Sequence, residues 1–326
     1  MHKFSLNLKI PKYKFLKSSP KVRLHEPSFG IPEIKKFSEV LSSTNVTMGK
    51  INKQFEKSYS KFNGVKYCIS NNSGSSANLL ALSAITNPLY QNYLKPGDEV
   101  IVPSLSWSTT VFPIIQCGLV PVLAEISPQT LNIDTNKIEK LITKKTKAIM
   151  IVHVYGNPCE MDEILRLKRK YNLILIEDSC EAMGAKYKNK MVGRFGDIST
   201  FSFYFSHHIT TLEGGMCVTN NPKTHDLLKV MRSHGWARDL ENKKDLEKKY
   251  KIDPRFLFLN LGYNLRMTEP QAAMGIIQLR KLNKFIKKRQ QVANYWKKEI
   301  SKLSDLISFQ ETTKSSENSF FGFAIN

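Results

Sequence analysis

Seven short segments of the chain are apolar and rich in β-branched or aromatic residues: residues 66–70, 98–104, 120–126, 147–156, 173–178, 198–205 and 215–220. The stretches between them place apolar residues at helical spacing, and several begin near a Ser or an Asp, as helices commonly do. The alternation predicts an α/β fold, in which helices flank a mostly parallel, seven-stranded sheet. Ligands of such sheets bind beyond the carboxyl ends of the strands, so the residues that follow each strand are the first candidates for a site.

A long helical pattern begins at Thr268, with a proline in its first turn,. We expect this helix to connect a large domain, residues 26–267, to the start of a small C-terminal domain within residues 268–326. The chain ends on SFFGFAIN, an apolar run that resembles a strand,, so we expect the small domain to be truncated. The basic residues 1–25 are expected to form a loosely ordered N-terminal arm.

The composition, with 41% hydrophobic and 24% charged residues in a chain of 326, is that of a globular protein with a large core,. No run reaches the roughly 18 apolar residues of a membrane span, and the N-terminus has no apolar signal-peptide core. We therefore expect a cytoplasmic protein without a membrane partner. The net charge of +21 comes from lysines that are spread along the chain without a nucleic-acid-binding motif,. We expect them to be solvated and to attract an anionic substrate, rather than nucleic acid.

The five cysteines are widely spaced and include no CxxC pair: Cys68, Cys117, Cys159, Cys180 and Cys217. Most have apolar neighbours in the sequence. They are therefore expected to be buried free thiols.

Two places along the predicted sheet carry candidate chemistry. Gly74, Ser75 and Ser76 follow the first strand and open a helix, whose unpaired N–H groups could bind phosphate, although many ordinary turns look the same. Asp178 ends the apolar run LILIED, and a buried carboxylate needs a cationic partner. The protonated ring nitrogen of pyridoxal phosphate is one such partner. A helix cap or a salt bridge is the alternative.

The segment FSFYFSHHITTLEGGMCVTNN resembles the DegT-type family of pyridoxal-phosphate-dependent nucleotide-sugar aminotransferases. In that family a lysine stands five residues after the serine of the Ser-Phe strand end and before a Glu-Gly-Gly. Here that position is His207, counted from Ser202, and no lysine lies between Lys190 and Lys223. His208 remains an alternative, because counting along a sequence tolerates a slip of one residue.

Within the family, this His-His replacement is typical of the sugar 3-dehydratases. The likeness runs through SGSSANLL, VPSLSWSTT, LIEDSCEAMGA, RSHGWARDL, GYNLRMTEPQAAMG and SFFGFAIN. It implies the aspartate-aminotransferase-like fold type I and a cytoplasmic role in deoxysugar and O-antigen lipopolysaccharide biosynthesis. The implied reaction is a glutamate-coupled 3-dehydration of a nucleoside-diphosphate 4-keto-6-deoxyhexose. The implied cofactor is pyridoxal 5′-phosphate, with its pyridoxamine form in turnover, and His207 is the implied base.

The resemblance also implies which residues hold the cofactor. Trp107 would stack on its ring, Asp178 would bind the ring nitrogen, and Glu181 would lie near the ring hydroxyl. The phosphate would be held by three residues of the same chain, Gly74, Ser75 and Ser202.

The likeness further implies residues at a subunit boundary. Asn264 would reach the phosphate in the neighbouring subunit, which implies a homodimer with shared active sites. His234 and Arg238 would form part of the active-site wall.

The chain departs from the pattern of the family in two respects. Some 3-dehydratases of the family carry an iron–sulfur cluster, which needs about four thiolates, but here no cysteine follows Cys217. We therefore expect neither cluster nor metal. The early end of the chain is the second departure.

Two alternative functions remain. An ordinary aminotransferase would need a lysine elsewhere in the site, and the other alternative is a catalytically inactive binding or regulatory protein of the same fold.

Overall fold

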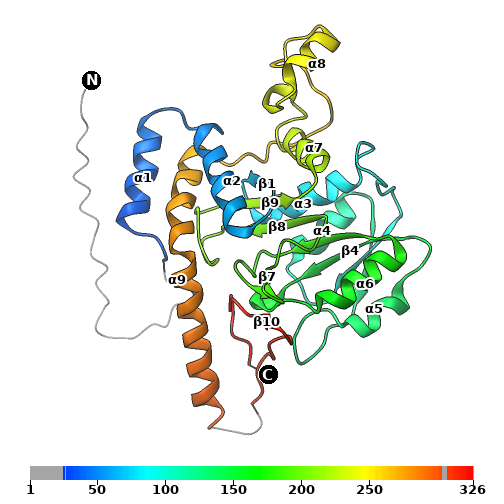
Figure 1. Ribbon diagram of the computed structural model, residues 1–326, viewed down its shortest axis with the longest axis vertical. Helices are drawn as coiled ribbons and strands as arrows, with labels where there is room; N and C mark the ends of the chain where they lie inside the picture. Colours follow the sequence, from blue (N-terminus) through cyan, green and yellow to red (C-terminus); the bar gives the residue numbers. More distant parts are fainter. Residues whose placement is uncertain (1–24, 26, 303–306, 326) are drawn as a thin grey trace.

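The sheet of the computed structural model contains all seven predicted strands. They are β1 (Tyr67–Asn71), β2 (Glu99–Pro103), β3 (Val120–Ala124), β4 (Thr146–Val152), β5 (Ile174–Asp178), β8 (Ile198–Ser202) and β9 (Gly215–Thr219). Their order is β1-β9-β8-β5-β4-β2-β3, and only β9 runs against its neighbours. The prediction of a mostly parallel sheet is confirmed (Figure 1). The structure describes residues 25, 27–302 and 307–325, so the predicted arm lies, except for His25, outside the described residues.

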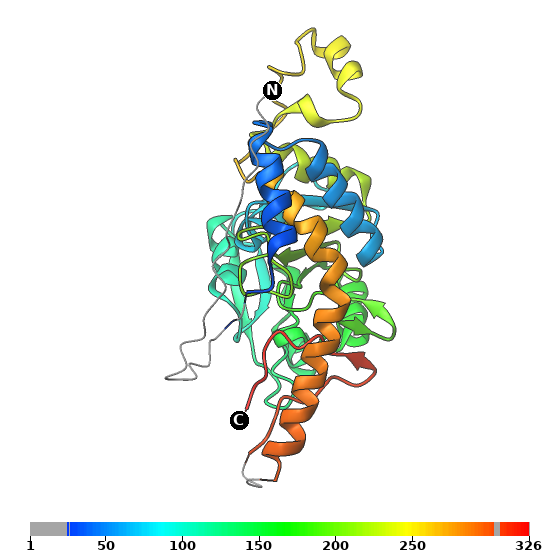
Figure 2. The ribbon, with the colours of Figure 1, turned by 90° about the vertical axis from the view of Figure 1, so that its left-hand side faces the viewer.

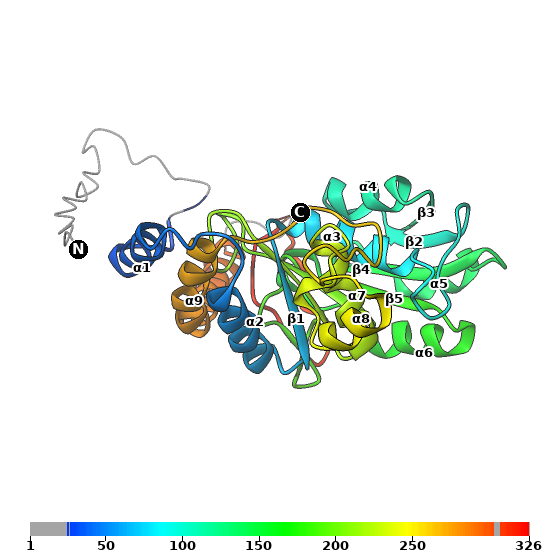
Figure 3. The same cartoon turned by 90° about the horizontal axis from the view of Figure 1, so that it is seen from above.

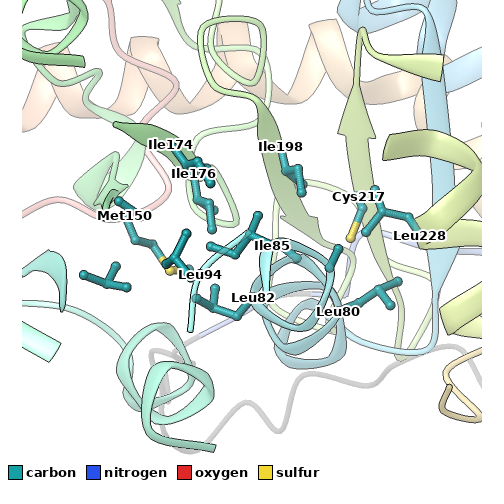
Figure 4. Packing of buried hydrophobic residues seen from close by; sticks show 14 of the residues in the cluster. Leu80, Leu82, Ile85, Leu94, Met150, Ile174, Ile176, Ile198, Cys217 and Leu228 are labelled. Carbon is teal, nitrogen blue, oxygen red and sulfur yellow. The ribbon is translucent and has the colours of Figure 1, made fainter. Parts of the chain in front are cut away.

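Successive residues of the central strands point to opposite faces of the sheet, as the alternation of side chains along a strand requires. Val100 and Val102 join a core cluster with α3 (Gly74–Ile85), α4 (Ser108–Gln116) and α7 (Pro222–Arg232). Figure 4 shows other members of this cluster, among them Leu80 of α3 and Leu228 of α7. Ile101 lies between them in sequence and packs on the other face, against α5 (Thr135–Leu141) and α6 (Met161–Tyr171). Figure 3 shows α4 and α6 on opposite sides of the sheet. The central strands are therefore buried on both faces.

The long helix α9 (Glu269–Ile300) begins where the sequence predicts it. The backbone N–H of Thr268 donates to Gln271 Oε1 at 2.9 Å, which closes the first turn,. Near this start, α2 (Lys50–Asn63) packs beside α9, and α1 (Ile31–Ser42) lies along α9 as well (Figure 2). None of the described helices is both long and apolar enough to cross a bilayer.

The remaining elements are short. The strands β6 (Lys186–Tyr187), β7 (Lys190–Met191) and β10 (Ser316–Glu317) form a separate small sheet in the order β10-β6-β7. The helix α8 (Lys243–Tyr250) stands away from the sheet (Figure 1), and two single turns are η1 (Val154–Gly156) and η2 (Ala237–Asp239). Two-residue strands show no periodicity in the sequence, so the small sheet was not predictable from the pattern.

Three segments that the sequence predicts as strands or strand-like differ in the structure. The segment 198–205 forms a strand only as far as Ser202. The segment 147–156 leaves the sheet after Val152 and ends in the single turn η1, in which Tyr155 adopts a left-handed backbone conformation, with φ of 54°,. The final run SFFGFAIN is not a strand of either sheet: of its described residues, Ile325 alone forms a bridge, with Phe309. Side chains bind the carbonyl groups of residues 318–321 instead of a neighbouring strand.

Candidate active site

A cavity of about 470 Å³ lies at the carboxyl edge of the sheet, where the loops that follow β1, β2, β4, β5 and β8 meet. Seven of the ten predicted site residues line it: Gly74, Ser75, Trp107, Asp178, Glu181, Ser202 and His207. This edge is where a parallel sheet is expected to bind its ligand. The lining contributed by the described residues includes no lysine.

Asp178, the last residue of β5, is 4% exposed. Its Oδ2 accepts hydrogen bonds from Asn78 Nδ2 at 2.9 Å and from Thr110 Oγ1 at 2.8 Å, and its Oδ1 accepts from the N–H of Cys180 at 3.1 Å. All three donors are neutral. They orient the carboxylate without neutralising its charge, so it can form an ion pair with a cationic group in the cavity.

The start of α3 forms the opposite part of the cavity. Ser73 caps the helix by accepting a hydrogen bond from the N–H of Ser76 at 3.0 Å,. A Cβ atom on Gly74 would lie 2.5 Å from Ser202 Cβ and 2.8 Å from Ser202 Oγ, so a glycine is required for this approach to β8. Ser75 Oγ donates to Thr109 Oγ1 at 3.0 Å. The arrangement gathers hydroxyl groups around the positive end of a helix, which suits a phosphate.

His207 and His208 face different surroundings. His207 lines the cavity, and its Nδ1 lies 2.8 Å from the carbonyl oxygen of Cys180. Because a carbonyl oxygen can only accept a hydrogen bond, Nδ1 carries the proton and Nε2 is the basic nitrogen. Burial lowers the pKa of His207 to about 4, and the ring is therefore neutral at pH 7. His208 is 1% exposed and lies outside the lining, and its Nε2 donates to the carbonyl of Ser319 at 3.1 Å.

Glu181 is a second ionisable group beside Asp178. Its Oε2 accepts a hydrogen bond from the N–H of Tyr155 at 2.8 Å. Burial, with a smaller contribution from the charge of Asp178, raises the pKa of Glu181 to about 7. Near neutral pH this carboxyl group is therefore able to donate as well as accept a hydrogen bond.

Trp107 precedes the first residue of α4 and is 72% exposed. Its indole borders the same cavity as Asp178. An aromatic side chain in this place offers a flat apolar face to a planar ligand.

Three predicted residues do not line this cavity: Asn264, His234 and Arg238. Asn264 is exposed, and its Oδ1 accepts a hydrogen bond from Arg266 Nε at 3.1 Å. The ring of His234 lies 5.6 Å from that of Trp236, and the guanidinium of Arg238 lies 4.4 Å from the Trp236 ring. In this chain His234 and Arg238 lie against Trp236 and not against the cavity. The role of all three residues in a neighbouring subunit stays a prediction.

The sequence did not point to several other residues that line the cavity. Besides serines and threonines, those with polar, ionisable or aromatic side chains are Asn78, Tyr155, Cys180, Tyr204, Glu213 and Phe321. Asn78 stands four residues after Gly74, one helical turn away, which places both on one face of α3,. That spacing could have revealed it. Phe321 carries no such signal, because it comes from the far end of the chain.

The cysteines are free, as expected. Cys68, Cys159 and Cys217 are buried, whereas Cys117 and Cys180 are partly exposed. Burial raises the pKa of the Cys180 thiol, which lines the cavity. Within the described part of the chain, no three His, Cys, Asp or Glu side chains are grouped as a metal site would require.

Comparison with known proteins agrees with the geometry. The model of the DegT/DnrJ/EryC1/StrS aminotransferase family matches residues 29–326. The GDP-4-keto-6-deoxy-D-mannose 3-dehydratase of Yersinia pseudotuberculosis is 40% identical over 296 residues, which are 90% of this chain and 74% of that protein. The lipopolysaccharide biosynthesis protein RfbH of Salmonella typhimurium is 41% identical over 313 residues, 91% of this chain and 70% of that protein.

A solved structure of a GDP-4-keto-6-deoxymannose 3-dehydratase superimposes with a TM-score of 0.87 at 38% identity, over 93% of this chain and 78% of that one. It contains a trapped geminal diamine of pyridoxal phosphate and glutamate. The α/β fold with its mostly parallel sheet is thus that of pyridoxal-phosphate enzymes of fold type I.

Proposed function

We propose, because the chain belongs to the DegT/DnrJ/EryC1/StrS aminotransferase family, that it is a pyridoxal-phosphate-dependent sugar 3-dehydratase. Its substrate is a nucleoside-diphosphate 4-keto-6-deoxyhexose, with GDP-4-keto-6-deoxymannose as the first candidate, and L-glutamate is the co-substrate. The observation that carries the proposal is His207, a neutral imidazole in a cavity whose described lining includes no lysine. The names of the relatives support a role in lipopolysaccharide biosynthesis, and we place the enzyme in the cytoplasm.

The residues around the cavity fit the cofactor. Asp178 is a buried carboxylate whose three neutral donors leave it free to bind a protonated ring nitrogen. The start of α3 with Gly74, Ser75 and Ser202 would hold the phosphate, and Trp107 would cover one face of the ring. When bound, pyridoxal phosphate supplies an electron sink that stabilises negative charge on a carbon of the substrate.

His207 acts as the base in this proposal. Its Nδ1–H is committed to the carbonyl of Cys180, which holds the ring and leaves Nε2 to accept a proton in the cavity,. Because an imidazole forms no stable imine with an aldehyde, His207 does not tether the cofactor as a lysine would. Glu181, whose pKa is raised by burial to about 7, lies in the same cavity and would bind the ring hydroxyl.

Removal of a hydroxyl from C3 next to a C4 ketone requires a proton to be taken and water to leave. The product is a 3-deoxy-4-keto sugar, and the amino group that glutamate supplies is released as ammonia. A conventional aminotransferase would instead leave that amino group on the sugar. The latter reaction is disfavoured because the described lining offers no lysine to move the proton,.

We further propose a homodimer in which Asn264 completes the phosphate site of the neighbouring subunit. The exposure of Asn264, and its position outside the cavity of its own chain, support this arrangement. His234 and Arg238 would approach the neighbouring site from the same side, since Ser233 forms a bridge with Asn264.

Product analysis tests the proposed reaction. The enzyme with pyridoxal phosphate, glutamate and a panel of nucleotide 4-keto-6-deoxysugars should yield 2-oxoglutarate, ammonia and a 3-deoxy-4-keto sugar, as resolved by mass spectrometry. An amino sugar as the product would establish transamination instead. Failure to turn over any sugar, together with tight cofactor binding, would favour a catalytically inactive binding protein.

A further inference from the structure

Residues 318–321 cross the active-site side of the molecule with each of their carbonyl groups bound by a side chain. The four contacts are Gln290 Nε2 to Asn318 O at 3.0 Å, His208 Nε2 to Ser319 O at 3.1 Å, and Arg289 Nη1 to Phe320 O and Phe321 O at 3.1 and 3.0 Å. An irregular segment would normally leave these groups to water. This one is fixed by α9 and by the histidine that follows His207.

The other edge of the segment is tied to the turn after β4. The N–H groups of Ser319 and Phe321 donate to the carbonyls of Gly156 at 3.0 Å and Tyr155 at 2.9 Å. A Cβ atom on Gly156, whose φ is 88°, would lie 2.6 Å from Ser319 Oγ and 2.8 Å from the backbone nitrogen of Phe320. The two backbones therefore pack as closely as a glycine permits.

This double attachment places the Phe321 ring against the imidazole of His207. The ring centroids are 4.8 Å apart with an interplanar angle of 35°, and Phe321 lines the cavity beside His207. Tyr204 approaches the imidazole edge-on at 6.2 Å, and Cys180 O holds its Nδ1. The imidazole is thus held by one hydrogen bond and by aromatic contact.

We infer that Phe321 is a positioning residue for His207, and that Arg289 acts on the site by holding Phe321 in place. The ring restricts the imidazole to the orientation in which Nδ1 meets Cys180 O, and it keeps water from that face,. This inference rests on the proposed function of His207 as the base. It also gives His208 a structural task, since His208 binds the carbonyl of Ser319 two residues before Phe321.

The charged and titratable groups that affect the pKa of His207 come from several elements: Asp178 from β5, Arg289 from α9, and His25 and His208 from loops. Glu181 and Glu213 line the same cavity. Burial has the largest effect and lowers the pKa of His207 to about 4, from an ordinary value of 6.5. Removal of the Phe321 ring admits water, stabilises the imidazolium and must raise this pKa.

Titration of His207 by NMR tests the inference without any catalytic assay. The protein carries seven histidines, and His207→Asn identifies the His207 signal in a ¹³C-histidine-labelled sample. In Phe321→Ala we expect the pKa of His207 to rise by roughly one unit or more, and in Phe321→Leu, which preserves the fold if alanine does not, by less.

Phe323→Leu is the matched control, because that ring contacts Trp296 and Phe309 rather than His207. It should leave the titration unchanged. An unshifted His207 pKa in folded Phe321→Ala and Phe321→Leu, or an equal shift in Phe323→Leu, would overturn the inference.

The link to Arg289 is tested by a double-mutant cycle on the same titration. The positive charge of Arg289 itself lowers the pKa of His207, so the substitution keeps that charge: Arg289→Lys should shift the His207 pKa in the same direction as Phe321→Ala but less, and should add little in the Phe321→Ala background. Additive shifts would show that Arg289 acts on His207 independently of Phe321 and would contradict the positioning route.

The expected rise in the pKa of His207 also predicts a change in the pH dependence of activity. His207 is active when neutral, so activity falls as the pH drops through its pKa, and a higher pKa moves this acid limb upward. Phe321→Ala should therefore lose more kcat at pH 6 than at pH 8, with KM little changed. If the wild-type protein proves to have no dehydratase activity, the proposed function fails while the NMR result still decides the positioning role.

Discussion

Asp178 is held by neutral donors on two helices, and this arrangement decides what a substitution there can do. In Asp178→Asn the amide oxygen can still accept from Asn78 and Thr110, and only the hydrogen bond from the Cys180 N–H is lost, so we expect the fold to survive. The loss of negative charge removes the partner of the ring nitrogen, and kcat should fall roughly 100-fold or more while the cofactor still binds. Kinetics together with a cofactor titration measures both effects.

Asp245→Asn, on the exposed helix α8, is the control for that substitution and should behave as wild type. Near-normal turnover by Asp178→Asn would contradict the proposed role of Asp178 as the partner of the ring nitrogen.

Residues of the site differ in how far the sequence reveals them. Asp178 could be predicted because an apolar strand ends on it, and His207 because it stands where a lysine is expected. The choice between His207 and His208 needed the fold, which turns one ring into the cavity and the other toward Ser319. Phe321 could not be predicted, because the sequence of an apolar run does not distinguish a phenylalanine that lines a site from one that packs in the core.

At the scale of elements, the start of α3 depends on the absence of a side chain at Gly74. In Gly74→Ala the new Cβ would meet Ser202 Cβ at 2.5 Å and would push the helix start away from β8. We expect the affinity for pyridoxal phosphate to fall by about tenfold or more, since the proposed phosphate site lies between these two elements. A fluorescence titration of the purified protein with the cofactor measures this change.

Gly30→Ala offers a matched comparison, because a Cβ atom on Gly30 would meet nothing within 4 Å. It should bind the cofactor as wild type does. Equal affinities for Gly74→Ala and wild type would show that the close approach of α3 and β8 is not needed for the phosphate site.

The main sheet was predictable because its strands are continuous apolar runs between helical patterns. The small sheet of β6, β7 and β10 was not, since its two-residue strands are brought together by chain segments far apart in sequence. The wrong prediction of a strand at SFFGFAIN has a related cause. The phenylalanines of this run are only partly buried and Ile325 is exposed. The carbonyl groups of residues 318–321 are bound by side chains of α9 and His208, which no local pattern encodes.

For the whole molecule, the proposal of shared sites makes a complementation test possible. Asn264→Ala and His207→Asn should each be impaired alone. In a mixed dimer, one site would combine the intact His207 of the first subunit with the intact Asn264 of the second, so part of the activity should return. The assay is dehydratase activity of heterodimers purified through two different affinity tags.

Mixing His207→Asn with Asp178→Asn provides the control, because both residues line the cavity of one chain and no intact site can form. Recovery in this control, or none in the Asn264→Ala pair, would contradict sharing through Asn264. The division into a large domain at 26–267 and a small one beyond it stays a prediction at this scale.

The central claim is that His207 occupies the place of a cofactor-binding lysine, and borohydride reduction tests it most directly. Reduction fixes pyridoxal phosphate to any lysine that holds it covalently, and mass spectrometry of peptides then locates the modified residue. The wild-type protein should carry no label in its active site, because His207 holds no covalent bond to the cofactor, whereas His207→Lys should be labelled at residue 207 and lose dehydratase activity. A phosphopyridoxyl group on a specific active-site lysine of the wild-type protein would contradict the account and would favour an aminotransferase.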